Sequence, residues 1–340
     1  MAKKVYVGID AASESFTASY LHTPGRVITA PQSFANTGVG IAALEIWLKA
    51  EGVPLKQAHF CIENTGVYSE TLCYQLHGLG RQLSLLDPRS LRRAFGDGHP
   101  KTDPLDSQKV AEYGFRYSDK LQPWKPRDVI VEQVQVILST REQLVQQKTA
   151  TQNSRSTLSR KVIQTPAANR ALESTLAHLS KQIVALEEEL KRLIRGNPSL
   201  LQGVTLLMSA PGVSWLLSSH LLVLTRGFTD LLQYRTLAQY LGVSPNEHTS
   251  GTSVHKKPRS RRYGPTTIRK LLHLAARSLR THEESARNYF LEKIAVGKPK
   301  SLVLNNIVNK LLKRLCAMLR SGIPYVRGHQ SINPRALALA

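Results

Sequence analysis

Four acidic residues early in the chain have the types and the spacing of a divalent-metal site. Asp10 and Glu63 each end an apolar, strand-like run. Side chains at the ends of adjacent strands project over one edge of a sheet, so two such strands can direct two carboxylates to one point. Asp103 and Asp106 are three residues apart where a helical pattern begins, which places both on one face of its first turn.

Four converging carboxylates repel one another unless cations neutralise them. Hard oxygen ligands of this kind suit Mg²⁺ or Mn²⁺, and such ions support phosphoryl transfer. The order strand–acid, strand–acid, helix–acid–acid therefore predicts a nuclease-type metal site on a ribonuclease H-like sheet. Taken singly, each acid has a simpler explanation as a turn residue or helix cap, and Asp103 before Pro104 could simply start a helix.

The charge of the chain is strongly positive and unevenly spread. Its 340 residues include 46 Lys and Arg against 24 Asp and Glu, a net charge of +22. The stretch 201–340 holds 21 basic and 5 acidic residues, and 248–282 holds no acid at all. This asymmetry predicts a nucleic-acid partner. The alternatives are a solvated basic face or a membrane-surface patch, and the absence of a basic amphipathic anchor argues against the membrane.

Length and composition bear on the number of folded units, the redox setting and the question of a membrane span. The length predicts two or three folded units. Three cysteines without metal-like spacing favour a reduced, cytoplasmic setting. The first apolar run is too short for a signal peptide. The stretch 196–225 lacks charged residues, but it contains Pro211-Gly212 and several serines, so we expect two short buried helices and no membrane span.

The first region, up to about residue 120, alternates strand and helix signals. Three early strands in series followed by alternating helices predict a mixed sheet covered on both faces. The expected strands lie near 4–10, 15–22, 27–34, 57–63 and 82–87, and the expected helices near 38–50, 66–78 and 103–117.

The second region, about 128–195, is predicted to form two long helices that break near 164–166. Apolar residues in its second half step by four and three, as in a coiled coil. These residues, called the leucine seam below, are Leu172, Leu176, Leu179, Ile183, Leu186, Leu190 and Leu193. A hairpin within one chain and a coiled coil between chains fit the pattern equally. The seam offers a way to pair protomers, and we predict a homo-oligomer, either a dimer or a tetramer.

The third region, about 200–325, is predicted to be mainly helical. Ala210-Pro211-Gly212-Val213 resembles the turn of a helix-hairpin-helix, whose backbone N–H groups can hold a phosphate, although it could be only a turn. Ser250-Gly251 lies within the acid-free stretch, and Gly264-Pro265 precedes a helix expected over 266–279.

These motifs, taken in order, resemble one family. The series is Gly-Ile-Asp, Ile-Glu-Asn-Thr-Gly, Lys-Thr-Asp-x-x-Asp, Ala-Pro-Gly-Val, Gly-Val-Ser-Pro, Ser-Gly-Thr-Ser, Tyr-Gly and Ile-Arg-Lys-Leu-Leu. It is similar to the Piv/MooV-type DEDD transposases of bacterial insertion sequences, several of which are guided by a bridge RNA. The resemblance implies a RuvC-like ribonuclease H-fold domain over 1–122, a coiled-coil hairpin over 123–198, a C-terminal transposase domain over 199–328 and a flexible tail over 329–340.

The resemblance also implies a mechanism and its residues. It places the catalytic, metal-binding carboxylates at Asp10, Glu63, Asp103 and Asp106, and a serine nucleophile at Ser250. The metal would polarise the scissile phosphate, and the serine would hold the cut DNA strand as a phosphoserine ester. Basic residues would clamp the nucleic-acid backbone: Lys256, Lys257, Arg259, Arg261, Arg262, Arg269 and Lys270.

Some points stay open on chemistry alone. Thr249, Thr252 and Ser253 are rival nucleophiles beside Ser250. The chain departs from many relatives at Ser107, where they often have Ala, and after Ser253, where they often keep a Gly. Two other functions also fit: a metal-dependent nuclease or junction resolvase that uses water, and a non-catalytic nucleic-acid scaffold. A covalent protein–DNA adduct would exclude the first, and metal-dependent cutting would exclude the second.

Overall fold

The computed structural model describes residues 5–23, 26–96, 103–230, 233–250, 254–260 and 264–328. Within these ranges, the side chains of 22–29, 103–105 and 245–260 are outside the description. The chain divides between Pro126 and Arg127 into two compact units, called unit 1 and unit 2. The tail predicted at 329–340 lies outside the described residues.

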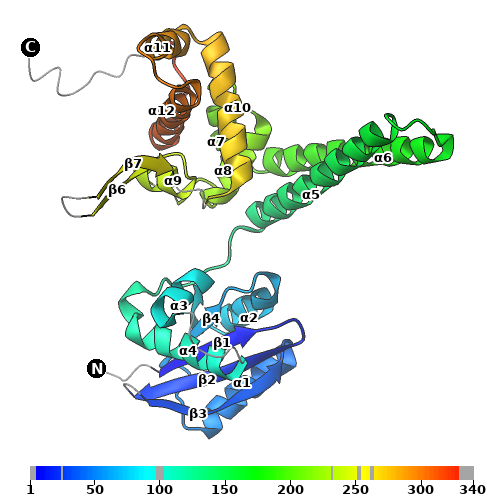
Figure 1. Ribbon diagram of the computed structural model, residues 1–340. Coiled ribbons are helices and arrows are strands. Elements are labelled where there is room, and N and C mark those ends of the chain that lie inside the picture. Colours follow the sequence, from blue (N-terminus) through cyan, green and yellow to red (C-terminus); the bar gives the residue numbers. More distant parts are fainter. Residues whose placement is uncertain are drawn as a thin grey trace, which may run out of the picture. The chain divides into compact units, whose positions relative to one another are not determined.

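Unit 1 is built on a five-stranded mixed sheet (Figure 1). Strand β1 pairs antiparallel with β2 and parallel with β4; β2 pairs antiparallel with β3, and β4 pairs parallel with β5. The spatial order β3-β2-β1-β4-β5 is consistent with the expected ribonuclease H-like sheet. The strands are β1 (Val5–Ala11), β2 (Ser15–Thr23), β3 (Arg26–Ala35), β4 (Ala58–Glu63) and β5 (Gln82–Leu86).

Helices cover both faces of this sheet. Helices α1 (Gly38–Ala50) and α2 (Val67–Gly78) bury their apolar stripes in one core cluster with alternate residues of β1 and β4. Helices α3 (Pro88–Phe95) and α4 (Asp103–Arg116) pack on the other face, followed by the short η1 (Ser118–Lys120). Because both faces are covered, β1 and β4 are apolar almost throughout and do not alternate with polar residues.

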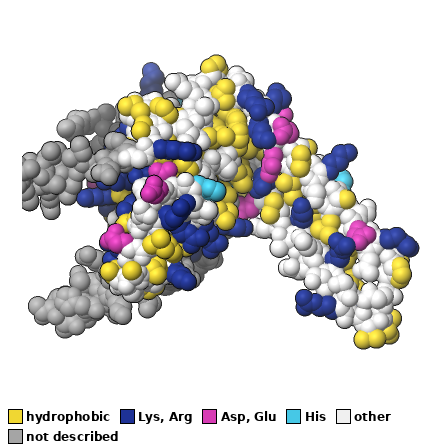
Figure 2. Space-filling model, turned by 90° about the horizontal axis from the view of Figure 1, so that it is seen from above, with side chains coloured by type: hydrophobic (Ala, Val, Ile, Leu, Met, Phe, Trp, Pro, Cys, Tyr) yellow, Lys and Arg dark blue, Asp and Glu magenta, His cyan; other side chains and the backbone are white. Residues whose placement is uncertain are grey.

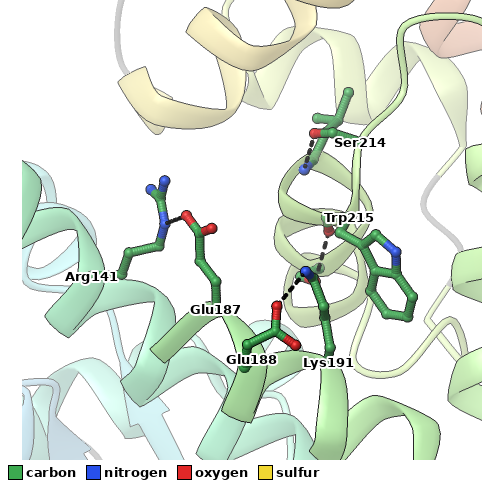
Figure 3. A network of polar contacts seen from close by, with 8 residues as sticks. Arg141, Glu187, Glu188, Lys191, Ser214 and Trp215 are labelled. Carbon is green, nitrogen blue, oxygen red and sulfur yellow. Dashed lines mark hydrogen bonds and ion pairs between the residues drawn. The ribbon is translucent and has the colours of Figure 1, made fainter. Parts of the chain in front are cut away.

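Unit 2 begins with a long helical hairpin of α5 (Val129–Leu158) and α6 (Pro166–Arg195) (Figure 1). Leu179, Ile183 and Leu190 of the leucine seam are buried, and no residue of the seam is fully exposed. Arg141 Nε of α5 lies 2.7 Å from Glu187 Oε1 of α6; Figure 3 shows Arg141 directed at Glu187 across the hairpin. The seam is therefore covered within one chain, and pairing of protomers through it remains a prediction.

The remainder of unit 2 is a helical body with one small hairpin of strands. Strands β6 (Pro245–Ser250) and β7 (Val254–Ser260) pair antiparallel, which the sequence did not lead us to expect. In the described part of the chain, no helix is both long and apolar enough to cross a membrane. The helices are α7 (Pro198–Met208), α8 (Trp215–Leu224), α9 (Tyr234–Tyr240), α10 (Thr266–His282), α11 (Glu284–Ala295) and α12 (Lys300–Ser321).

The turn between α7 and α8 packs into the core of this body. Ala210 and Val213 are buried, and a Cβ built on Gly212 would lie 2.8 Å from the carbonyl oxygen of Ala275 in α10. Ser214 Oγ accepts the N–H of Leu217 and so caps α8. These contacts give the expected helix-hairpin-helix-like turn a packing role, and a phosphate-binding role has no support among them.

Candidate active site

Close packing of α4 on the sheet brings its first turn to the edge where β1 and β4 end. A Cβ built on Gly8 of β1 would lie 2.2 Å from both Ala111 N and Ser107 O, so only glycine permits this approach. Ser107 is fully buried, and its Oγ lies 2.6 Å from Ser19 Oγ of β2. Ser107, noted above as a departure from many relatives, thus has a polar partner in the sheet. Asp106 is held in place by the residue that follows it.

Asp10 and Glu63 stand beside each other at this same edge. Strands β1 and β4 are parallel, and Ile9 pairs with Ile62, so the next residue on each strand is a carboxylate. The carboxyl ends of parallel strands meet at one edge of a sheet, where the chain has to turn and side chains are open to ligands.

Three of the four expected carboxylates line one cavity of about 370 Å³. They are Asp10, Glu63 and Asp106. Lys109, one helical turn after Asp106, is also in the wall, and its Nζ lies 2.9 Å from Asp106 Oδ1. The rest of the wall comes from the turn after β4 and from α3 and α4: Thr65, Pro88, Leu91, Arg92, Phe95, Gly96 and Val110.

The donors in this cavity suit a hard divalent cation, since all three are carboxylates. The described residues contain no group of three or more His, Cys, Asp or Glu side chains close enough to hold a metal. The fourth expected ligand, Asp103, is the first residue of α4, and its side chain lies outside the description. The cavity therefore gathers the right kind of ligand, and one of them, Asp106, already has an ammonium partner.

Ser250 occupies the end of a hairpin whose base is firmly held. It is the last residue of β6, paired with Val254, next to residues 251–253, which lie outside the described residues. At the base, Asn305 Nδ2 and Asn309 Nδ2 of α12 each donate to Val243 O at 2.8 Å. The rival residues Thr252 and Ser253 lie outside the described residues; Thr249 is in β6, and its side chain is not described.

The segment at Gly264, which leads into α10, is packed just as closely as Val243. A Cβ on Gly264 would lie 2.0 Å from Tyr240 O, so the segment that enters α10 passes directly against α9. The chain on both sides of the β6–β7 hairpin, at Val243 and at Gly264, is thus packed against the helical body that carries the serine.

The predicted basic residues follow this hairpin into α10. Lys256, Lys257 and Arg259 are in β7 with side chains outside the description, and Arg261 and Arg262 lie outside it altogether. On α10, Lys270 is exposed and Arg269 is half-buried; within the described residues no hydrogen-bond partner reaches Arg269 Nη1. Figure 2 shows Lys and Arg side chains spread over the visible face of the molecule among hydrophobic and acidic ones.

Comparison with known proteins gives the family. Residues 7–163 match a family model for DEDD transposases of the IS110 type, described as a transposase, and residues 204–291 match one described as the transposase IS116/IS110/IS902 family. Both matched segments are IS110-family transposase domains. The first match contains the carboxylate cavity, and the second contains the β6–β7 hairpin.

Similar proteins agree with this assignment. Two proteins called pilin gene-inverting protein, from Moraxella lacunata and Moraxella bovis, are each 27% identical to the chain over 327 residues, which is 95% of this chain and 98% of theirs. An uncharacterized 43.6 kDa protein of insertion element IS110 from Streptomyces coelicolor is 29% identical over 155 residues, which is 46% of this chain and 37% of that protein. The chain is a transposase/recombinase, and its DEDD domain implies use of divalent metal in general.

The structure adds residues that the sequence did not single out. Lys109 pairs with Asp106, and Arg92 reaches the cavity from α3, a helix that was not predicted. Ser19 supports α4 from β2. For Lys109, the i, i+3 spacing from Asp106 is a signal that could have been used; for the other two, the contacts arise only in the tertiary fold.

Proposed function

We propose that the chain cuts and rejoins DNA strands with a metal-bearing carboxylate site and a serine nucleophile. The metal ligands in this proposal are Asp10, Glu63, Asp103 and Asp106, the metal is Mg²⁺ or Mn²⁺, and the nucleophile is Ser250. The observation that carries the proposal is the meeting of Asp10, Glu63 and Asp106 in one cavity at the edge of the sheet. The finer identity of unit 1 as a RuvC-like ribonuclease H fold belongs to the same proposal and is supported by the strand order.

Each of the chain's own groups has a part in the reaction. A divalent metal in the cavity would supply Lewis-acid polarisation of the scissile phosphate. The Ser250 hydroxyl attacks phosphorus and loses its proton as an Oγ–P bond forms. The bond from phosphorus to one deoxyribose oxygen breaks, and that oxygen takes up a proton and leaves as a hydroxyl. Because the ester retains the energy of the broken bond, the reverse attack by another strand's hydroxyl rejoins DNA without a high-energy cofactor.

Basic residues near the serine bind the backbone in this proposal. The β6–β7 register pairs His248 with Lys256 and Ser250 with Val254, so Lys256 is close to the serine along the hairpin. Lys256, Lys257 and Arg259, with Arg261, Arg262, Arg269 and Lys270, would neutralise phosphates on either side of the cut.

Assembly and partners are further parts of the proposal. The carboxylates belong to unit 1 and the serine to unit 2, so the two halves of a site can come from different protomers of a dimer or tetramer. The name of the Moraxella relatives states that they invert a pilin gene, and site-specific inversion uses the same cutting and rejoining. The resemblance to bridge-RNA-guided transposases adds a structured guide RNA as a second nucleic-acid partner, and the basic excess of the chain could bind its phosphates. A bacterial protein with these partners would work in the cytoplasm, at the nucleoid.

The carboxylate site is tested by substitutions with a matched control on α4. Asp10→Asn and Asp106→Asn should each abolish metal-dependent strand cleavage, while DNA binding in EDTA should not weaken, because neither carboxylate attracts phosphate. Glu112→Gln, on the same helix, should cleave normally because Glu112 is paired with Arg116 and does not line the cavity. Wild-type cleavage by either Asp variant would remove that residue from the site.

A further inference from the structure

The wall of the carboxylate cavity contains two basic residues that the proposed reaction leaves without a role. Arg92 of α3 and Lys109 of α4 are both in its wall, together with Asp10, Glu63 and Asp106. Lys109 Nζ is engaged by Asp106 at 2.9 Å, so its charge is largely neutralised within the protein.

The fold directs only one of two adjacent arginines to this cavity. Helix α3 is fixed by Leu91, which is buried in one cluster with Val110 of α4. Arg92 follows Leu91 and lines the cavity, as do Pro88 and Phe95 on the same helix. Arg93 is also exposed but is not part of the wall. The two arginines carry the same charge and lie on the same helix, but only Arg92 lies in the cavity wall.

The electrostatics of the cavity create a need for such a residue. A DNA strand brings a phosphodiester to a wall that contains Asp10 and Glu63 beside the Asp106–Lys109 pair, and like charges in a partly enclosed site repel strongly. A guanidinium can meet this repulsion by donating two parallel N–H bonds to the non-bridging oxygens of one phosphate, which an ammonium cannot do. The cavity, at about 370 Å³, lies within the range of pockets that hold small ligands and can admit a nucleotide unit.

We propose that Arg92 binds a backbone phosphodiester of the DNA strand that enters the carboxylate cavity. The contact is made before metal arrives and does not depend on which hydroxyl then attacks. The inference rests on the proposed function, because it takes the cavity as the place where the strand lies, and it assigns to α3 the task of holding the strand there.

The test is a scan of single neutral phosphates. A set of oligonucleotides from the element end, each with one methylphosphonate, is titrated with the full-length protein in EDTA. With wild-type protein and with Arg93→Ala, one or two positions should weaken binding by about tenfold, as expected for a lost bond between charged groups. In Arg92→Ala, the methylphosphonate at one of those positions should no longer weaken binding. The guanidinium that contacts this phosphate is already absent, so neutralising the phosphate removes no further interaction. Arg92→Lys should retain part of the effect.

The outcomes separate this inference from the proposed function. If Arg92→Ala gives the same profile as wild type and Arg93→Ala, the inference is wrong, whatever the protein does with metal. The same scan is made on an RNA strand. If Arg92→Ala abolishes the effect of a methylphosphonate only on RNA and not on DNA, the inference is also wrong. If the expected position is erased but wild-type protein cuts no DNA when Mg²⁺ or Mn²⁺ is added, the proposed function fails and the binding role of Arg92 stands. Thermal melts of all three variants show whether each is folded.

Discussion

At the scale of single residues, Gly8 decides how near the first turn of α4 comes to the carboxylates of the strands. A methyl group at this position would meet Ala111 N and Ser107 O at 2.2 Å. Relief of that clash requires α4 to move away from β1, and Asp106 would move with it. Thus a residue without chemistry of its own controls the geometry of the site.

Gly8→Ala should therefore lower the free energy of unfolding of unit 1 by about 1–3 kcal/mol or more, as is usual for overpacking in a closed core, and should also reduce metal-dependent cleavage. Urea denaturation followed by circular dichroism measures the first effect. Gly78→Ala is the matched control, because a Cβ at the end of α2 meets nothing within 4 Å. Equal stability of the two variants would show that α4 does not lie against β1 as described.

The sequence was sufficient to predict those residues of the cavity whose placement follows from their own strand or helix. Asp10, Glu63 and Asp106 could be predicted because each carboxylate ends a strand or begins a helix, and the structure gathers all three. Ser19 and Arg92 could not be found in this way. Ser19 is an ordinary serine in an apolar strand until α4 lies over it, and Arg92 differs from Arg93 only through the tertiary position of α3.

At the scale of elements, the α5–α6 hairpin shows what a periodic pattern can and cannot establish. The heptad spacing in the second half of the region predicted α6, and both expected helices form: α5 ends at Leu158 and α6 begins at Pro166. Periodicity could not say which helix covers the seam, because a helix of the same chain and one of another chain present equivalent apolar faces. Burial of the seam against α5, reinforced by Arg141–Glu187 and Arg155–Glu173, makes a second chain unnecessary for covering it.

Ile183 and its neighbour Val184 offer a test of the hairpin. Ile183 is buried and Val184 is 59% exposed. Ile183→Ala should lower the free energy of unfolding of unit 2 by about 2–4 kcal/mol through the cavity it leaves, whereas Val184→Ala should change it by no more than about 0.5 kcal/mol. Chemical denaturation of both variants measures the difference. Equal losses would mean that the seam is not buried as the structure has it; light scattering of the same samples reports any change of assembly.

The elements that were not predicted, α3, β6 and β7, all lack a local apolar pattern of helix or strand. Helix α3 has eight residues and only one buried side chain, Leu91, so its apolar residues are too few to establish a helical period in the sequence. Strands β6 and β7 are polar and basic, with Pro258 inside the second, and a Pro within a run argues against a strand. Their pairing is set by the anchored base at Val243 and Gly264, which is a tertiary feature.

At the scale of the whole molecule, two histidines of unit 2 make its stability depend on pH. Burial lowers the pKa of His220, and Arg141 lowers it further while Glu142 acts in the opposite direction. Burial also lowers the pKa of His273, aided by the charges of Arg277 and Arg269. In both cases the folded protein binds a proton less readily than the unfolded chain does.

Stability should therefore be complete above the ordinary histidine pKa, which is about 6.5, and should fall as the pH drops below that value, since the unfolded state then binds more protons. Urea unfolding of unit 2 at a series of pH values from neutral downward measures this slope. The double variant His220→Gln, His273→Gln should flatten it, while His178→Gln, a change at an exposed residue of α6, should leave it unchanged. A slope that persists in the double variant would assign the effect to other groups.

The molecule as a whole has its carboxylates in unit 1 and its serine in unit 2, and the central claim is that both act on one phosphate. The most direct measurement is the capture of a covalent protein–DNA adduct on a denaturing gel, with the attachment site mapped by mass spectrometry. With divalent metal present, wild-type protein should give an adduct at Ser250. Ser250→Ala and Asp10→Asn should each give none. A mixture of the two variants should restore the adduct if the carboxylates and the serine of one site come from different protomers. Cleavage by wild-type protein without any adduct would mean that water is the nucleophile, and an adduct that persists in Ser250→Ala and maps to Ser253 would contradict the assignment of the serine.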